Sequence, residues 1–440
     1  MRGGAILGFI FVSALAHGLA ARWLHQNFRA VRERTKLLLA ITAFLSVLPG
    51  AVRVIIRNQP SSGWMAVFAV LMVEVSSVIV AVMPITLASV IARGVWWVKD
   101  RKEIENAEQV ARRLEAEAVA KADADADATA DADADADADA KADADADAKA
   151  EERAEAYART VGRREAIEKG IGLSIFAGTG LAMGWGSLRG RHAFQLEEVA
   201  VKIAGWPKAL DGYTIAQISD IHVGAFVGDR ELEEGLEVLK RAKPDLVVAT
   251  GDLVDFRAEV VTALAARLAA LDVRDGVAAI LGNHDHYAGP ADVVEGLQRS
   301  GVRVLSNEAV RLRKGDGGGF SLIGLDDLAG RARPQGTFRG PDLARAIAMQ
   351  PPDLPRILLA HQPNFLRESA GRVALQLSGH THGGQINPGF RPADLVMTYV
   401  SGRYERDGTT LWVNRGFGVA GPPSRVGAPP EVTKIVLVAG

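Results

Sequence analysis

Residues 378–386 read Ser-Gly-His-Thr-His-Gly-Gly-Gln-Ile, and this stretch decides the fold that we expect for the chain. It follows an apolar run over residues 373–377, so its two histidines lie where a buried strand continues into a loop. The flanking glycines permit close approach of the backbone, and the single intervening residue lets both imidazoles point into one cavity. This placement is typical of metal ligands, although a His-x-His pair taken alone also occurs on surfaces and in cores.

Four further polar clusters each follow an apolar run that predicts a strand. The five runs cover residues 213–218, 246–249, 277–281, 357–360 and 373–377. The four clusters are Asp220-Ile221-His222, Gly251-Asp252, Gly282-Asn283-His284-Asp285 and His361. In open sheets with mostly parallel strands, ligands bind outside the carboxyl ends of the strands. We therefore expect the five clusters to meet in space.

The composition of the chain indicates at least two parts. Its 440 residues exceed the usual length of one domain, roughly 100–200 residues. A hydrophobic content of 48% with only 6% aromatic residues fits membrane helices joined to an α/β domain. The absence of cysteine excludes disulfides, thiolate metal sites and cysteine nucleophiles.

The net charge of −2 is unevenly distributed. Residues 121–150 hold eleven Asp and three Lys, a net charge of −8, so the remaining 410 residues carry about +6. The C-terminal half contains no Lys/Arg stripe with interleaved aromatic residues, which is the pattern expected of a nucleic-acid binder. We therefore expect no nucleic-acid partner.

The first 100 residues predict a membrane segment with three transmembrane helices. Long apolar runs cover residues 4–21, 37–56 and 63–91, and a bilayer core of about 30 Å needs roughly 20 apolar residues. A cleaved signal peptide is the alternative for the first run, but the two later runs favour a multi-pass segment. The loop between the first two runs carries Arg22, Arg29, Arg32, Arg34 and Lys36, which predicts that this loop is cytoplasmic.

A linker and a fourth membrane helix are predicted next. Residues 101–165 are charged and Ala-rich with repeated Ala-Asp dipeptides, which predicts a solvated linker; metal buffering by the aspartates is the alternative. Arg163 and Arg164 precede the fourth predicted helix, residues 166–189, and resemble a twin-arginine export signal. An ordinary membrane span with positive residues on its inner side is the alternative. Both readings place residues 190–440 on the outer, periplasmic or extracellular, face.

The segment from residue 190 to the end predicts an α/β domain. Amphipathic helices are expected over residues 230–242, 258–271, 291–300 and 341–349, and they alternate with short strands as in βαβ units. Later strands, over residues 302–305, 309–312, 320–323, 410–413 and 432–438, follow without intervening helices and predict a second sheet. The expected architecture is a sandwich of two sheets flanked by helices.

The five clusters together resemble the signature blocks of the calcineurin-like metallophosphoesterases. The blocks are Asp220-x-His222, Gly251-Asp252-x-x-Asp255, Gly282-Asn283-His284-Asp285, His361 and Gly379-His380-Thr381-His382, in that order. The resemblance covers residues 213–438 and is specific, because five ordered blocks rarely occur by chance. It extends to the bacterial membrane-anchored or exported branch of the family. It implies a four-layer α-β-β-α sandwich and a location in the bacterial inner or plasma membrane.

The resemblance also implies a centre of two divalent metal ions. The implied ligands are Asp220, His222 and His382 for one ion, Asn283, His361 and His380 for the other, and Asp252 as a bridge. Carboxylate, amide and imidazole ligands without sulfur suit Mn, Fe, Zn or similar ions. A water that bridges two such ions loses a proton and becomes the nucleophile toward a phosphoester.

Several residues beside these ligands have predicted roles. His284 is expected to contact the phosphoryl oxygen or protonate the leaving group, with Asp285 orienting its ring; a structural loop histidine is the alternative. Asp255 is expected to hydrogen-bond a ligand histidine or the loop backbone. Contact with substrate or a packing role is equally open for His286, Tyr287, Arg415 and Arg425.

The activity implied is metal-dependent hydrolysis of a phosphoric ester, with a phosphodiesterase favoured over a phosphatase. The predicted partners are the bilayer and a phosphoester substrate, drawn from lipids or the cell envelope. An inactive membrane sensor or scaffold with this domain is one alternative, but the ligand set is complete. A nuclease is another, and the missing basic channel and the predicted outer location oppose it.

Overall fold

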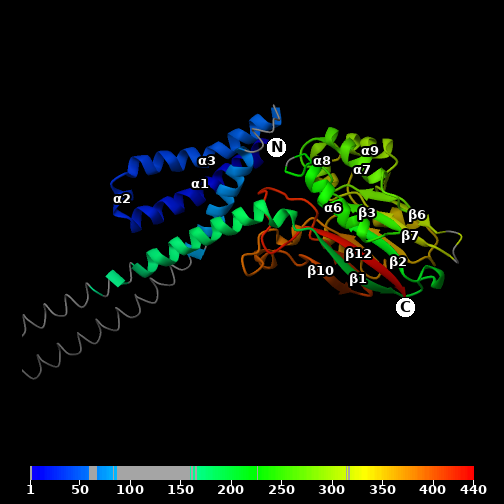
Figure 1. Ribbon diagram of the computed structural model, residues 1–440. Coiled ribbons are helices and arrows are strands. Elements are labelled where there is room, and N and C mark those ends of the chain that lie inside the picture. Colours follow the sequence, from blue (N-terminus) through cyan, green and yellow to red (C-terminus); the bar gives the residue numbers. More distant parts are fainter. Residues whose placement is uncertain are drawn as a thin grey trace, which may run out of the picture. The chain divides into compact units, whose positions relative to one another are not determined.

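The computed structural model describes residues 2–58, 67–82, 84–86, 159, 162–163, 166–224, 226–313, 315 and 318–440. Two compact units are present (Figure 1). One contains residues 3–46 and 77–179, and the other contains residues 47–76 and 180–440, as far as these are described. The predicted clusters all belong to the second unit.

The first sheet has six strands in the order β1-β12-β2-β3-β4-β5. Its strands are β1 (Gln195–Ile203), β12 (Glu431–Ala439), β2 (Tyr213–Ile218), β3 (Leu246–Thr250), β4 (Val277–Ile280) and β5 (Arg303–Val304). Strands β2, β3, β4 and β5 pair in parallel, whereas β12 is antiparallel to β2 and parallel to β1. The parallel strands bring their carboxyl ends to one edge of the sheet.

The second sheet has the order β10-β11-β9-β8-β7-β6. Its strands are β10 (Gly402–Arg406), β11 (Thr409–Val413), β9 (Leu375–Ser378), β8 (Arg356–Leu359), β7 (Phe320–Gly324) and β6 (Glu308–Leu312). Strands β7, β8, β9 and β11 are parallel, with an antiparallel strand at each edge.

The prediction that all the later strands form the second sheet is wrong for two of them. The strand predicted over residues 432–438 is β12, which lies inside the first sheet, and the strand predicted over residues 302–305 is β5, at its edge. Strand pairing depends on which hydrophobic faces meet, and order along the chain does not determine it.

Helices in the second unit flank the two sheets. Their bounds are α6 (Asp229–Arg241), α7 (Val261–Ala269), α8 (Asn283–Ala288), α9 (Pro290–Arg299), α10 (Ala329–Ala332), α11 (Leu343–Ala348) and α12 (Leu366–Ser369). Short 3-10 turns occur at Gly190–His192, Lys208–Leu210, Ala258–Val260, Pro363–Phe365, His382–Gly384 and Pro392–Leu395. The four predicted amphipathic helices correspond to α6, α7, α9 and α11.

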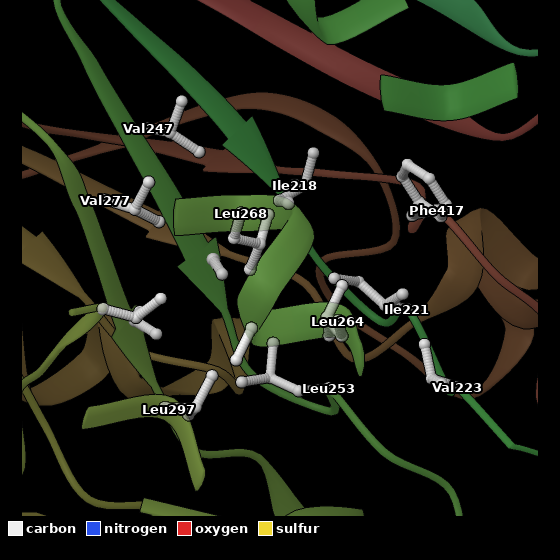
Figure 2. Packing of buried hydrophobic residues seen from close by; sticks show 14 of the residues in the cluster. Ile218, Ile221, Val223, Val247, Leu253, Leu264, Leu268, Val277, Leu297 and Phe417 are labelled. Carbon is white, nitrogen blue, oxygen red and sulfur yellow. The ribbon is translucent and has the colours of Figure 1, made fainter. Parts of the chain in front are cut away.

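Alternating strand residues build the layers, because successive side chains of a strand point to opposite faces. Ile218 and Val247 pack beneath Leu264 and Leu268 of α7, as Figure 2 shows. The other face of the same strands packs against the inner face of the second sheet. Helix α11 covers the outer face of the second sheet. The order of layers is therefore α-β-β-α, which confirms the predicted fold class.

The N-terminal part contains apolar helices. Helix α1 (Arg2–Asn27) covers the first predicted span, and a short α2 (Arg29–Arg32) and α3 (Thr35–Asn58) follow. In the described part of the chain, three helices are long and apolar enough to cross a membrane: Thr35–Val52, Val67–Thr86 and Ala166–His192. These match the second, third and fourth predicted spans. The predicted linker, residues 101–165, falls almost entirely outside the described residues.

Candidate metal centre

The candidate metal centre lies where strands of both sheets end. Strands β2, β3 and β4 of the first sheet lead to Asp220, Asp252 and Asn283, and strands β8 and β9 of the second lead to His361 and His380. The two sheets meet closely here. A Cβ atom on Gly379 would lie 1.9 Å from Oγ of Ser219, so only glycine fits at this position.

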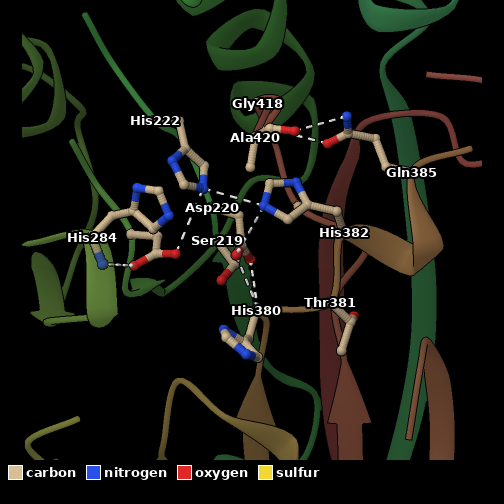
Figure 3. A network of polar contacts seen from close by, with 12 residues as sticks. Ser219, Asp220, His222, His284, His380, Thr381, His382, Gln385, Gly418 and Ala420 are labelled. Atoms are coloured by element: carbon tan, nitrogen blue, oxygen red, sulfur yellow. Dashed lines mark hydrogen bonds and ion pairs between the residues drawn. The ribbon is translucent and has the colours of Figure 1, made fainter. Parts of the chain in front are cut away.

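Asp220, His222 and His382 form one group of metal-ligating atoms, all within 4.8 Å of one another. Nε2 of His222 lies 3.2 Å from Nε2 of His382, which in turn lies 3.5 Å from Oδ1 of Asp220 (Figure 3). The backbone amide of His380 donates to both carboxylate oxygens of Asp220, at 2.9 and 3.0 Å. The group therefore presents two imidazole nitrogens and a fixed carboxylate to one point.

A second group consists of Asp252, His361 and His380. Nδ1 of His380 lies 3.3 Å from Nε2 of His361, and Nδ1 of His361 lies 2.8 Å from the carbonyl oxygen of Thr250. Sequence reasoning missed Thr250; its position beside Gly251 is the only signal the chain gives.

Asp252 connects the two groups. Its Oδ2 atom lies 3.3 Å from Nε2 of His361 and 3.6 Å from Nε2 of His222. Its Oδ1 atom accepts a hydrogen bond of 2.7 Å from the backbone amide of His284. One carboxylate oxygen thus faces a histidine of each group, which is the placement that a bridging ligand requires.

Asn283 provides an observation that points to a cation. Its Oδ1 atom is buried and has no hydrogen-bond partner among the described residues. A buried amide oxygen without a partner is costly, and a cation would satisfy it. Asn283 begins α8 next to Gly282, where a Cβ atom would lie 2.3 Å from Oδ1 of Asp252.

The backbone is strained at most of the predicted ligands. Five of them have a positive φ: Asp220 (53°), His222 (53°), Asp252 (52°), His380 (74°) and His382 (51°). They are half of the ten non-glycine residues with positive φ in the described part of the chain. Such conformations cluster at functional sites, where the surrounding fold holds them.

The protonation states of three predicted ligands, Asp252, His380 and His382, favour metal binding. Burial opposes ionisation of Asp252, but the charges and hydrogen bond of His361 and the charge of His222 hold its pKa well below the ordinary value. Burial and the neighbouring His222 and Arg425 place the pKa of His382 well below its ordinary value, and burial with His361 lowers the pKa of His380. An ionised carboxylate and neutral imidazoles are the forms that bind metal ions. His361 differs: burial opposes its charge, but the charge and hydrogen bond of Asp252 raise its pKa well above the ordinary value, so a bound cation would displace its proton. The residues present therefore fit divalent cations.

Asp255, not Asp285, orients the ring of His284. Nδ1 of His284 lies 2.9 Å from Oδ1 of Asp255, and the same oxygen lies 3.4 Å from Nδ1 of His222. The carboxylate of Asp285 instead accepts backbone hydrogen bonds from Leu253, Val254 and Gly282, at 2.8–3.0 Å. The predicted orienting role of Asp285 is therefore wrong: its oxygens hold the loops after β3 and β4 together.

The four residues considered for substrate contact have different surroundings in the structure. His286 is buried and pairs with Asp326 at 2.7 Å, and Arg415 pairs with Glu431 at 2.9 Å. Tyr287 is partly exposed, with its ring centroid 5.6 Å from that of His284. Of these residues, Tyr287 alone is both exposed and next to the centre.

Arg425 is fully buried behind the ligand His382. Its Nη2 atom lies 3.3 Å from Nδ1 of His382, and its Nη1 atom donates to the carbonyl oxygens of His382 and Ala428, at 3.4 and 2.9 Å. Its Nε atom donates to the carbonyl oxygen of Gly418 at 2.7 Å. Arg425 therefore supports a ligand histidine from behind.

Comparison with known proteins identifies the family to which this domain belongs. Residues 213–384 match the family model of the calcineurin-like phosphoesterases. An uncharacterized metallophosphoesterase of Aquifex aeolicus is 34% identical over 249 residues, which cover 56% of this chain and 92% of that protein. The chain therefore belongs to the calcineurin-like metallophosphoesterase family, whose members are metal-dependent.

Two further relatives differ in how much of their own length the match covers. The metallophosphoesterase YkuE of Bacillus subtilis is 32% identical over 254 residues, 56% of this chain and 86% of that protein. A bovine relative, described as a transmembrane protein with metallophosphoesterase domain, is 34% identical over 251 residues. The match covers 55% of this chain and only 56% of the bovine protein.

Proposed function

We propose that this protein is a membrane-anchored phosphodiesterase with a centre of two divalent metal ions. The observation that carries the proposal is the position of Asp252, whose Oδ2 atom faces one histidine from each of two ligand groups. Asp220, His222 and His382 would hold one ion, and Asn283, His361 and His380 the other. Mn, Fe, Zn or similar ions suit this mixture of oxygen and nitrogen donors.

The chain's own residues supply positioning and a proton. When bound, such ions would acidify a water and offset the charge of the phosphoryl group. With its Nδ1 proton directed to Asp255, His284 can present Nε2 to the substrate and donate a proton to the leaving group. The buried carboxylate of Asp285 keeps the loops after β3 and β4 in register, so that Asp252 and His284 stay in place.

The proposed location is a bacterial inner or plasma membrane, with the domain on its outer face. Three helices of the described chain are apolar enough to span a bilayer. Arginine and lysine side chains are concentrated in the loop between the first two predicted spans, which favours a cytoplasmic position of that loop. Membrane phosphoesters or envelope-derived phosphoesters are the proposed substrates. No nucleic-acid partner is proposed.

The test of this activity uses the full-length protein purified in detergent and stripped of metal. It is titrated with Mn, Zn, Fe(II) and Mg against an aryl phosphodiester and the matching monoester. We expect metal-dependent turnover with preference for the diester. Asp252→Ala should lower it by at least about a hundredfold, more than loss of an outer partner of a metal ligand causes. Asp272→Ala, an exposed aspartate, is the matched control.

Two outcomes would contradict the proposal. Bound metal without turnover of either ester would favour an inactive sensor or scaffold. Preference for the monoester would make the protein a phosphatase.

A further inference from the structure

One loop beside the metal centre exposes large apolar side chains. Residues 388–398, here called the apolar loop, contain Phe390, Leu395, Val396 and Met397, with exposed fractions of 62%, 79%, 83% and 40%. Among the other described residues from 193 to 440, comparable exposure of a large apolar side chain occurs at Phe256, Tyr287 and Met349. Soluble proteins rarely expose such patches unless the patch contacts a partner or a membrane.

The apolar loop packs against the turn that carries His382. A Cβ atom on Gly384 would lie 3.2 Å from Cγ of Arg391 and 3.3 Å from Cβ of Ala393. Nδ2 of Asn387, just before the loop, donates to the carbonyl oxygen of Gly383 at 3.0 Å. The loop that exposes these apolar side chains therefore contacts the turn directly after the candidate ligand His382.

Asn387, just before the apolar loop, is connected through residues 424–426 to the end of the last predicted span. The backbone amide of Asn387 donates to the carbonyl oxygen of Val426 at 2.7 Å. Two residues earlier, Oγ of Ser424 donates to the carbonyl oxygen of Met183, inside the span Ala166–His192. Residues 424–426 thus contact both the span and Asn387, the residue that precedes the apolar loop by one position, and residues 180–440 belong to one compact unit.

The end of this span has an apolar surface of its own. Leu181, Trp185 and Leu188 are largely exposed on it. Tryptophan is enriched where membrane helices leave the hydrocarbon core and enter the headgroup region. Trp185 therefore marks the level of the interface. Ser424 and Arg425 contact the helix at this level, through the carbonyl oxygens of Met183 and Gly186.

We propose that the apolar loop lies in the bilayer surface beside the last span, and that the metal centre acts on phosphoesters carried by amphiphiles in that surface. The apolar loop binds the boundary between the lipid headgroups and the acyl chains. Exposed large apolar side chains bind that boundary through buried apolar area. The inference rests on the proposed membrane anchoring and hydrolysis. It adds a surface that contacts the bilayer and narrows the proposed substrates to amphiphiles held in that bilayer.

The first test measures contact with lipid and is independent of activity. The chain has no cysteine, so Val396→Cys and Met349→Cys each introduce one labelling site for a polarity-sensitive fluorophore. The full-length proteins are placed in vesicles of phosphatidylcholine and phosphatidylglycerol with brominated acyl chains. We expect quenching of the label at position 396 and none at position 349, which is exposed directly after α11 and lies outside the apolar loop. Equal quenching at both positions, or none at position 396, would overturn the surface contact.

The second test measures the substrate class. Ethyl and hexadecyl p-nitrophenyl phosphate share one leaving group, and the hexadecyl ester inserts into the vesicles. Combined Phe390→Ser, Leu395→Ser and Val396→Ser should lower kcat/KM for the hexadecyl ester about tenfold, while the ethyl ester changes less than about twofold. Met349→Ser is the control. Equal loss on both esters, or loss on neither, would overturn the proposal.

The two tests separate this inference from the proposed function. If the unaltered protein hydrolyses neither ester although the label at position 396 is quenched, the proposed activity and the substrate class fail and the surface contact stands. If both esters are hydrolysed without quenching, the activity stands and the role of the apolar loop is overturned.

Discussion

At the scale of single residues, the centre combines strained backbone with buried charge. Positive φ values at five predicted ligands cost about 1–3 kcal/mol each. The fold maintains them because each carboxylate is held by backbone amides, as Asp220 is by the amide of His380. The sequence blocks identify these residues, but no pattern in the chain indicates which aspartate orients His284. Asp285 is adjacent to His284 in the chain and Asp255 belongs to another block, yet the folded loops place Asp255 against the ring.

We predict that His284 keeps its proton through neutral pH in the metal-free protein. Burial opposes this charge, but the hydrogen bond to Asp255 and the charge of Asp252 raise its pKa to about 9. The ring should lose its proton as pH rises through about 9, and Asp255→Asn should move that titration toward the ordinary histidine pKa. Metal loading should lower it too, because cations repel the proton. Proton NMR of histidine-labelled protein measures this, and an unshifted pKa in Asp255→Asn would contradict the pairing.

Arg425 offers a second prediction at this scale. Its removal leaves the carbonyl oxygens of Gly418 and Ala428 without a buried donor and frees the ring of His382. Arg425→Met should lower the free energy of unfolding by about 1–3 kcal/mol, because buried carbonyl oxygens lose their donor. Metal affinity should fall about 10- to 100-fold, because an outer partner of a ligand is lost. Denaturant titration and metal competition measure the two effects, with exposed Arg403→Met as control; unchanged metal affinity would exclude the supporting role.

At the scale of elements, apolar runs and motif spacing predict the strands that carry the centre. All five strands before the blocks are present, as β2, β3, β4, β8 and β9. Their pairing is less predictable. The C-terminal strand β12 returns to the first sheet between β1 and β2 because its apolar face completes that layer. Sequence order carries no signal for such long-range pairing.

Helix α6 gives a prediction about packing between elements. A Cβ atom on Gly235 would lie 2.1 Å from the ring of Phe417, in the loop that follows β11. Gly235→Ala should therefore destabilise the protein by about 1–3 kcal/mol, although alanine favours helix by about 1 kcal/mol. Thermal unfolding measures the effect. Gly178→Ala is the control, because a Cβ atom there would meet no described atom within 4 Å beyond its chain neighbours and its own helix backbone. Equal stability of the two variants would contradict the close packing.

At the scale of the whole molecule, a metallophosphoesterase domain follows helices that are apolar enough to span a membrane. Metal binding should be coupled to the stability of this domain, since the ligands come from strands of both sheets. Removing metal should lower the melting temperature. Metal at a hundred times its Kd should restore about 2.7 kcal/mol of stability. Asp252→Ala should respond less, and a metal-independent melting temperature in the unaltered protein would contradict this coupling.

The most direct measurement is the number of metal ions bound per chain. The full-length protein is loaded with Mn or Zn in detergent, freed of excess metal and analysed by elemental mass spectrometry. Two ions per chain are predicted, with at most one in Asp252→Ala and two in the control Asp272→Ala. A single ion in the unaltered protein, or two retained after loss of Asp252, would contradict a centre in which Asp252 joins two metal sites.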